Sequence, residues 1–307
     1  MKNMKRAPVG VVIPTFNSGH LVTEAIDSVL RQSVVPAEII VVDDGSKDDT
    51  RERVARYGQQ IRYLYHQNQG VSATRNRGVQ EAGCEYIAFL DADDVWHPKK
   101  LELQLAALSR EPGLGLLGTR TLNWPAARFA ELADLAGERL EVVPWERLVV
   151  KNCFVTSSIL TPRRILRQVG LFDTGLQGPE DYDLWLRVAE VSRVANLDLP
   201  LTGYREVPSS LSKQAAQMEA GVLKILAKLD ERGAWRGRRL LRRKAYSHAS
   251  HSCAYMYGAA GYHARALLRS IGSLLSYPFP YRKDEVRVPL ERPKRLVWSL
   301  LHLLHLG

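Results

Sequence analysis

Three carboxylates stand together at Asp91, Asp93 and Asp94, directly after residues 85–90, whose apolar run predicts a short buried strand. Clustered charges are costly without a counter-ion, and the carboxyl ends of strands are where open α/β sheets bind ligands. A divalent metal ion that carries a phosphorylated ligand is the partner this chemistry favours. The alternative is a solvated loop in which Asp94 caps a helix that begins near Pro98.

Two earlier segments of the chain end in polar turns of the same kind. The β-branched residues 9–13 stop at Pro14-Thr15-Phe16-Asn17, and residues 38–42 stop at Asp43-Asp44-Gly45-Ser46. A helical pattern follows each of them, and this alternation of strand and helix predicts a parallel sheet. The polar turns then meet at one carboxyl edge, where a single crevice can use them together with the acidic cluster.

A third strand and helix carry a cation. Residues 61–65 predict a strand, and residues 70–78, Gly-Val-Ser-Ala-Thr-Arg-Asn-Arg-Gly, open the helix that leads to the acidic cluster. The start of a helix presents free N–H groups, and Arg75 beside it suits a phosphate or the carboxylates themselves. The alternative is an ordinary helix on which Arg75 is a surface or ion-pair residue.

Together, these motifs resemble the inverting family 2 glycosyltransferases, which have the GT-A nucleotide-sugar fold. The resemblance covers roughly residues 8–212 and rests on the order and spacing of segments 12–17, 41–46, 70–78, 89–94 and 178–187. It implies an α/β domain with a mostly parallel, Rossmann-like sheet flanked by helices. It also implies transfer of a sugar from a nucleotide-diphosphate sugar, a UDP-sugar first of all, in a bacterial surface-glycan or lipid-linked saccharide pathway.

The resemblance assigns roles to individual residues. The nucleotide-sugar pocket would comprise Pro14, Thr15, Asn17, Asp44, Arg75, Asp91 and Ala92. In it Asp44 would accept a hydrogen bond from the base or ribose, and Asp91 would face the ribose or a metal-bound water. Asp93, together with Asp91, would hold the Mg²⁺ or Mn²⁺ that bridges the diphosphate, which an oxygen-only site suits.

Two further carboxylates, Glu180 and Asp181, follow Pro179 at the start of a predicted helix. Taken alone, acids in a first helical turn are explained by the helix dipole. In the resemblance Asp181 matches the general base, and Glu180 would position the acceptor or the base. A sugar hydroxyl is a weak nucleophile, so a carboxylate must take its proton while the nucleoside diphosphate leaves from the opposite face. One such displacement inverts the anomeric carbon.

The sequence departs from the family pattern at several points, and these limit what the resemblance predicts about metal ligands and processivity. The segment 203–212 has Val207 where the family often places a histidine, which leaves a third metal or diphosphate ligand open. The Q-x-x-R-W element of processive synthases and their long apolar spans are missing, which favours one sugar per encounter. Trp124 and Trp145, between the donor motifs and the predicted base, are expected to shape the acceptor side.

Rival functions make different demands on the sequence. A nicotinamide oxidoreductase would need G-x-G-x-x-G after the first strand, and a nucleotidyltransferase a glycine-rich basic loop there; residues 13–19 supply neither. A catalytically silent nucleotide-sugar-binding or membrane-assembly protein on the same fold remains open. Loss of turnover in an Asp181→Asn variant that still binds donor would distinguish the enzyme from the silent protein.

The composition predicts a folded enzyme in a reducing compartment. The chain has 307 residues, of which 45% are hydrophobic and 25% charged, enough for a sizeable core. Its three cysteines are widely spaced and form no C-x-x-C pattern, which argues against a disulfide framework. Residues 1–8 are basic without the apolar stretch of a signal peptide, so we expect a cytoplasmic protein.

The basic charge is concentrated at the end of the chain. We therefore divide the chain into a catalytic domain, residues 1–212, and a helical basic region, residues 213–307. From Glu231 onward twelve Arg and three Lys oppose one Asp and three Glu, a net charge of +11, whereas the whole chain carries +10. No nucleic-acid motif accompanies these basic residues, so a nucleic-acid partner is not expected.

Two segments of this region predict amphipathic helices. Five apolar residues share one helical face: Leu267, Leu268, Ile271, Leu274 and Leu275. In residues 296–306, Ser299, His302 and His305 form a narrow polar stripe on an otherwise apolar run. This run is about half as long as the roughly 20 residues that a membrane span needs. Basic flanks suit the inner, anionic face of the cell membrane through residues 265–307, close to a lipid-linked acceptor. The alternative is that these leucines pack on the catalytic domain or on a partner.

Overall fold

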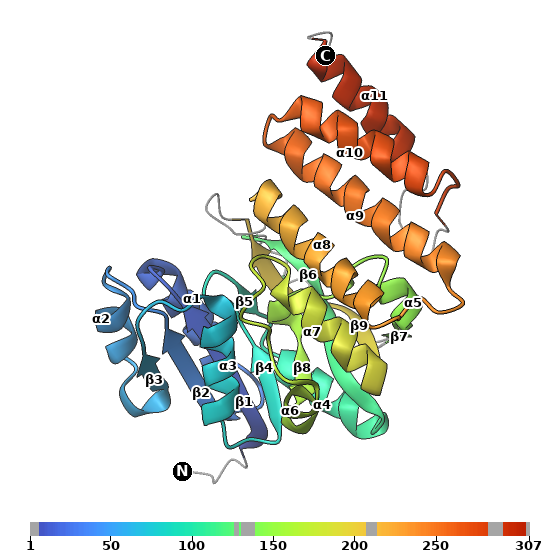
Figure 1. Ribbon diagram of the computed structural model, residues 1–307. Helices are drawn as coiled ribbons and strands as arrows, with labels where there is room; N and C mark the ends of the chain where they lie inside the picture. The colour runs from blue at the N-terminus through green and yellow to red at the C-terminus, as the bar shows by residue number, and fades with distance from the viewer. Residues whose placement is uncertain (1–5, 126–128, 130–138, 207–213, 282–290, 305–307) are drawn as a thin grey trace. The chain divides into compact units, whose positions relative to one another are not determined.

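The computed structural model describes residues 6–125, 129, 139–206, 214–281 and 291–304 (Figure 1). The chain divides into two compact units. Unit 1 comprises Met1–Pro144, Phe154–Thr174 and Asp181–Val207, and unit 2 comprises Trp145–Cys153, Gly175–Glu180 and Pro208–Gly307. The predicted α/β fold with a helical C-terminal region is confirmed, while the division into functional domains at residue 212 stays a proposal.

The first half of unit 1 is the predicted parallel sheet. Strands β1 (Ala7–Thr15), β2 (Pro36–Asp43), β3 (Arg62–Tyr65) and β4 (Tyr86–Phe89) lie in the order β3-β2-β1-β4, and each adjacent pair is parallel. The central strand β1 is buried on both faces, as expected of a parallel sheet covered by helices. The polar turns after β1, β2 and β4 therefore share one edge.

The second half of the sheet is mixed. Strand β8 (Leu160–Pro162) pairs antiparallel with β4 and with β6 (Leu114–Trp124), and β6 runs parallel to the long strand β9 (Arg193–Arg205). Two short strands, β5 (Val95–Trp96) and β7 (Leu140–Val142), pair antiparallel with β9. The parallel character that the sequence predicts thus belongs mainly to the strands before residue 90.

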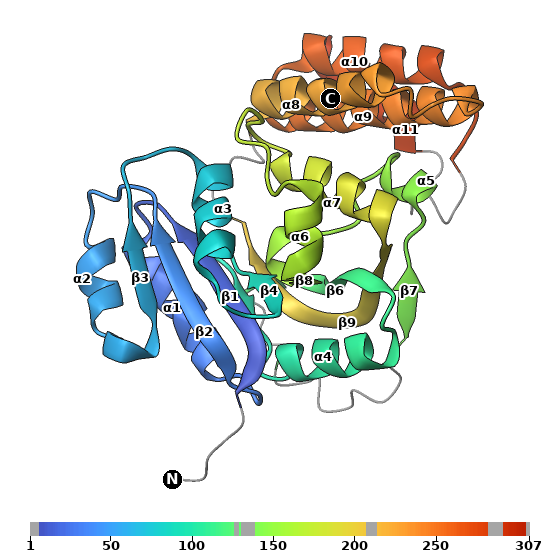
Figure 2. The ribbon, with the colours of Figure 1, turned by 60° about the horizontal axis from the view of Figure 1, so that its bottom comes forward.

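Helices cover both faces of this sheet. They are α1 (Gly19–Leu30), α2 (Thr50–Ala55), α3 (Val71–Glu81), α4 (Lys100–Arg110), α6 (Arg163–Val169) and α7 (Glu180–Val191). Figure 2 shows α4 on one side of strands β6 and β9 and α6 and α7 on the other. Helix α3 lies very close to β1, because a Cβ atom on Gly78 would stand 2.3 Å from a methyl group of Val12. Only glycine permits this approach, which explains the last residue of the 70–78 motif.

Unit 2 is built from helices. After the short α5 (Trp145–Leu148) come α8 (Ala215–Glu231), α9 (Arg239–Ala259), α10 (His263–Ser276) and α11 (Glu291–Leu303), with α9 packed on α10 and α10 on α11. The buried Arg292 fastens α11: its guanidinium donates to Ser247 Oγ at 2.9 Å and lies 4.2 Å from the ring centre of Tyr281. Among the described residues no helix is long and apolar enough to cross a bilayer.

Candidate active site

The turns after β1 and β2 are locked to each other. The N–H of Asn17 donates to Ser46 Oγ at 2.8 Å, and Asn17 Oδ1 accepts from the N–H of Lys47 at 2.8 Å. Asn17 adopts a left-handed backbone with φ of 49°, which asparagine tolerates better than most residues, and Gly45 has φ of 84°. The two strand ends therefore form one rigid edge, as a pocket for a nucleoside requires.

The two aspartates after β2 hold the neighbouring turns. Asp43 is fully buried and accepts from Tyr63 Oη–H at 2.6 Å, and burial beside this carboxylate raises the pKa of Tyr63. Asp44 accepts the backbone N–H groups of Gln69 and Gly70 at 2.8 and 3.0 Å. Both oxygens of Asp44 are thus engaged with the loop that leads into α3, so a nucleoside would meet only the remaining lone pairs of this carboxylate.

His66 belongs to the same corner, and the sequence does not point to it. Its Nδ1 lies 3.3 Å from Asp44 Oδ1 and 2.8 Å from the carbonyl oxygen of Gln67. Its Nε2 is buried and, within the described part of the chain, has no hydrogen-bond partner. A lone histidine in a loop carries no sequence signal, because only the pairing of β2 with β3 brings it to Asp44.

Arg75 faces the acidic cluster. It is buried, and its guanidinium forms an ion pair with Asp91 at 2.7 Å while lying 5.4 Å from the ring centre of Phe172. The sequence predicts a phosphate or a carboxylate as the partner of Arg75, and the structure shows it paired with the carboxylate of Asp91. Asp91 keeps 30% of its side chain exposed, so one face of this ion pair remains open to a ligand.

The other two acids of the cluster differ in their surroundings. Burial and repulsion by Asp91 raise the pKa of Asp93 to about 6. Asp94 is buried, and burial with repulsion by both neighbouring carboxylates raises its pKa further above the usual range. Asp94 accepts the N–H of Arg205 at 2.9 Å, and α4 begins after Lys99, so the alternative of a helix cap at Asp94 is wrong.

Asp91 and Asp93 fit a divalent cation. Burial and, after it, repulsion by Asp91 raise the pKa of Asp93, and a cation between the two carboxylates would favour the ionised form of Asp93. Within the described residues no group of three His, Cys, Asp or Glu side chains has the arrangement of a metal site. Two carboxylates completed by phosphate oxygens and water are a common way of holding Mg²⁺ at a phosphorylated substrate.

One short turn ties the acidic cluster to the predicted base. In the 3₁₀ turn Thr156–Ser158, the hydroxyl of Thr156 donates to Asp181 Oδ2 at 3.1 Å. The next hydroxyl, on the fully buried Ser157, accepts the N–H of Asp91 at 3.0 Å and also hydrogen-bonds the carboxylate of Asp94. Asp91, which is 66 positions from Ser157, and Asp181, which is 25 positions from Thr156, are therefore hydrogen-bonded to consecutive residues of this turn. Sequence analysis missed these two residues, because Thr-Ser-Ser carries no motif of its own.

Helix α7 is held against the same strand end. Trp185 is fully buried, with its ring centre 6.4 Å from that of Phe89 in β4 and 6.1 Å from that of Phe172. Since Phe89 precedes the acidic cluster by two residues, this packing sets the first turn of α7 relative to the cluster. Asp181 is partly exposed at that turn, whereas Glu180 is buried and assigned to unit 2, so its positioning role stays a prediction.

Within the described residues, no contact brings Trp124 or Trp145 into this site. Trp124, at the end of β6, lies 5.5 Å from the ring of Phe129, whereas Trp145 in unit 2 lies 6.1 Å from Trp235. Their role on the acceptor side stays a prediction. Val207 lies outside the described residues.

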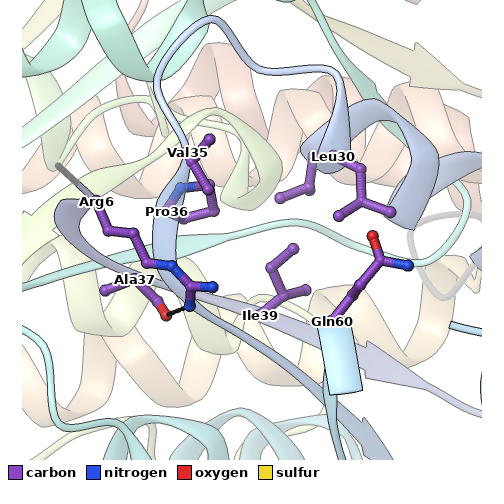
Figure 3. A pocket seen from close by; sticks show the side chains of 8 residues that line it. Arg6, Leu30, Val35, Pro36, Ala37, Ile39 and Gln60 are labelled. Atoms are coloured by element: carbon purple, nitrogen blue, oxygen red, sulfur yellow. Dashed lines mark hydrogen bonds between the residues drawn. The ribbon is translucent and has the colours of Figure 1, made fainter. Parts of the chain in front are cut away.

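A small cavity elsewhere in unit 1 is not the site. It has a volume of about 130 Å³ and is lined by Leu30, the start of β2 and Arg6, whose guanidinium donates to the carbonyl oxygen of Ala37 (Figure 3). A small-molecule site commonly occupies about 300–1,000 Å³. The cavity also lies at the amino end of β2, opposite the edge that carries the polar turns.

The 3₁₀ turn can be tested by replacing Ser157 with alanine. The change leaves the N–H of Asp91 without its buried acceptor, and a loss of about 1–3 kcal/mol in the free energy of unfolding is expected. Because the acidic cluster loses its anchor, metal-dependent donor affinity should also fall about tenfold. Chemical denaturation and calorimetry measure the two effects.

Ser158→Ala is the matched control for this change. Ser158 is equally buried, but its hydroxyl donates to the carbonyl oxygen of Val155 within the same turn. This variant should lose stability without a comparable loss of donor affinity. Equal effects of both variants on donor affinity would show that Ser157 does not position the cluster.

Comparison with known proteins identifies the class. Residues 10–155 match the family model described as Glycosyl transferase family 2, which supports the predicted family for this segment of the chain. An uncharacterized glycosyltransferase of Rickettsia typhi is 32% identical over 209 residues, which cover 63% of this chain and 63% of the relative. The chain spans 62%, 33% and 63% of the length of three such Rickettsia relatives.

One relative has a fully specified name. The UDP-Glc:alpha-D-GlcNAc-diphosphoundecaprenol beta-1,3-glucosyltransferase WfgD of Escherichia coli is 27% identical over 212 residues, covering 66% of this chain and 79% of the relative.

Solved structures agree on the fold. Residues 1–349 of S. aureus TarS, in complex with UDP-GlcNAc, superpose with a TM-score of 0.61 at 16% identity, covering 89% of this chain and 93% of that fragment. The mannosyltransferase PcManGT of Pyrobaculum calidifontis, in complex with GDP-Man and Mn²⁺, gives 0.57 at 19% identity, covering 99% and 89%. These likenesses confirm the predicted GT-A type fold.

Proposed function

We propose that this chain transfers one sugar from a nucleotide-diphosphate sugar to an acceptor hydroxyl, with inversion at the anomeric carbon and with Asp181 as general base. The observation that carries the proposal is the convergence of the acidic cluster and Asp181 on Thr156 and Ser157. A donor-side anchor and a base attached to one turn can face the same sugar from two sides. An inverting displacement needs this arrangement.

On the donor side, the locked turns after β1 and β2 would hold the nucleoside through Pro14, Thr15 and Asn17. Asp91 and Asp93 would hold Mg²⁺ or Mn²⁺, which stabilises the negative charge of the departing nucleoside diphosphate. Arg75, already paired with Asp91, orients the first carboxylate. The Mn²⁺ named for PcManGT supports a metal in this fold.

On the acceptor side, Asp181 would take the proton of the sugar hydroxyl. The hydroxyl of Thr156 donates to one oxygen of this carboxylate and the N–H of Tyr182 donates to the other at 2.6 Å, and both contacts orient the carboxylate. Partial exposure at the first turn of α7 gives an acceptor access to Asp181. Glu180 would position the acceptor or the base.

The acceptor we propose is a lipid-linked saccharide at the inner face of the cell membrane. The name of WfgD specifies a UDP-sugar donor and a diphosphoundecaprenol-linked acceptor, which supports this class over a soluble one. The basic residues of the C-terminal region suit the anionic surface at which such acceptors lie.

Calorimetric titration with UDP-Glc, UDP-GlcNAc and GDP-Man, each with and without Mn²⁺, tests the donor site. We expect one donor to bind with a Kd in the micromolar range and at least tenfold more weakly without the metal. Failure of every donor to bind to protein that is folded by circular dichroism would contradict the proposal. Binding without turnover on any acceptor would favour a silent nucleotide-sugar-binding protein.

A further inference from the structure

Helix α10 turns its small side chains inward and its large apolar ones outward. Ala266, Ser270 and Ser273 are buried against the rest of unit 2. By contrast, Leu268 is 67% exposed and Leu275 is 75% exposed. Helices of water-soluble proteins ordinarily bury the large apolar face instead.

Helix α11 shows the same inversion. The polar stripe predicted from the sequence points into unit 2, since Ser299 is fully buried and His302 partly so. The opposite face exposes Val297, Leu300 and Leu304, at 56%, 44% and 55%. Helix–helix contact through small and polar residues, with large apolar residues outside, is typical of proteins that face lipid.

We call the exposed apolar residues of both helices the outer apolar face. It consists of Leu268, Ile271, Leu275, Val297, Leu300 and Leu304. Helices α9, α10 and α11 lie side by side in unit 2 (Figures 1 and 2). The six side chains are between 40% and 75% exposed, so the described part of the chain leaves them largely uncovered. A solvent-exposed apolar surface of this kind marks an interaction site.

The positive charge around this face indicates which kind of partner it binds. From residue 232 to residue 283 the chain has nine Arg and two Lys and no Asp or Glu. Arg265 and Arg269 lie in α10 itself, where Arg269 pairs with Glu219 at 2.5 Å, and Lys294 and Arg295 lie in α11. A second copy of the chain would bring the same positive charge and be repelled, whereas an anionic lipid surface is complementary to it.

We propose that the outer apolar face inserts into the headgroup region of an anionic bilayer, with the surrounding arginines on the lipid phosphates. Helices α10 and α11 then lie in the membrane surface, as amphipathic helices with basic flanks do. The inference deepens the membrane contact of the proposed function. Lipid binding by this face does not depend on sugar transfer, so either can fail without the other.

Sedimentation with vesicles tests the inference on the full chain. We expect the protein to bind phosphatidylcholine vesicles that contain 30% phosphatidylglycerol at least tenfold more tightly than pure phosphatidylcholine vesicles, and 0.5 M NaCl to weaken this binding. The double substitution Leu268→Gln with Leu275→Gln should reduce binding to the anionic vesicles at least tenfold. Both side chains are largely exposed, so the fold should be retained.

Val191→Gln is the matched control, because Val191 is an exposed apolar residue of unit 1. It should bind vesicles within twofold of the wild type, and donor affinity measured without vesicles should be the same in all three proteins. Two results would overturn the inference: wild-type protein that ignores anionic vesicles, or a double variant that binds them as well as the wild type. A wild-type dimer in light scattering that the double variant loses would assign the face to a second copy instead.

Discussion

Asp181→Asn should abolish sugar transfer, lowering kcat by about 10²–10⁴, while the Kd for the donor stays within twofold. General base catalysis accounts for a factor of this size, and an amide cannot take the acceptor proton. The amide oxygen can still accept from Thr156, so the first turn of α7 should keep its position. Single-turnover transfer assays and donor calorimetry measure the two quantities.

Asp198→Asn is the control for this substitution. Asp198 is an exposed carboxylate of β9 that pairs with Arg120 at 3.1 Å, so its loss should leave both quantities unchanged. Full transfer activity in Asp181→Asn would move the base to another residue. A parallel loss of donor affinity would mean that Asp181 supports the donor pocket rather than the acceptor.

Asp93→Asn should remove the metal dependence of donor binding, with a loss of at least 100-fold in donor affinity in the presence of Mn²⁺. The substitution would replace a charged oxygen ligand by a neutral one at a site where we propose Asp91 and Asp93 as the two carboxylate ligands. The same change should make the metal-free protein on the order of 1–2 kcal/mol more stable at pH 7.5, because it removes a buried charge and, with it, the repulsion by Asp91.

The pH dependence of this site has a definite sign. A folded-state pKa of about 6 lies above the ordinary value of 3.8, so the folded protein binds the proton more tightly than the unfolded chain does. Stability of the metal-free protein should therefore fall as the pH rises from about 4 to 6. Mn²⁺ binds the ionised carboxylates, so its stabilising shift in Tm should grow over the same range. An equal shift at pH 5 and pH 7.5, or one that survives Asp93→Asn, would contradict a metal at Asp93.

The local sequence pattern was sufficient to predict the strands before residue 90. The runs 9–13, 38–42, 61–65 and 85–90 all became strands, because alternation of β-branched runs with helical patterns leaves a parallel sheet as the main solution. The common edge of the polar turns followed from that topology alone. Beyond residue 110 the local signals are weaker, and the antiparallel insertion of β8 between β4 and β6 could not be anticipated.

Which partner each site residue takes was decided by tertiary structure. The sequence offered Arg75 a phosphate, a carboxylate or the solvent, and packing of α3 on β1 placed its guanidinium on Asp91. Asp44 was expected to serve a nucleoside, and the fold uses it first to hold the loop before α3. Hydrogen bonds between residues so far apart in the chain have no local signature.

For two features of this protein, the sequence predicted one part and the tertiary structure decided the other. The residue types and spacing of Asp91, Asp93 and Asp181 were sufficient to predict the chemistry that we propose for this chain. Their convergence on Thr156 and Ser157 was decided only by the packing of α7 and β8 against β4. Likewise, periodicity determined that α10 and α11 are two-sided helices, whereas the side that faces water was decided by packing within unit 2. A helical pattern specifies the angle between two faces and not the direction in which either points.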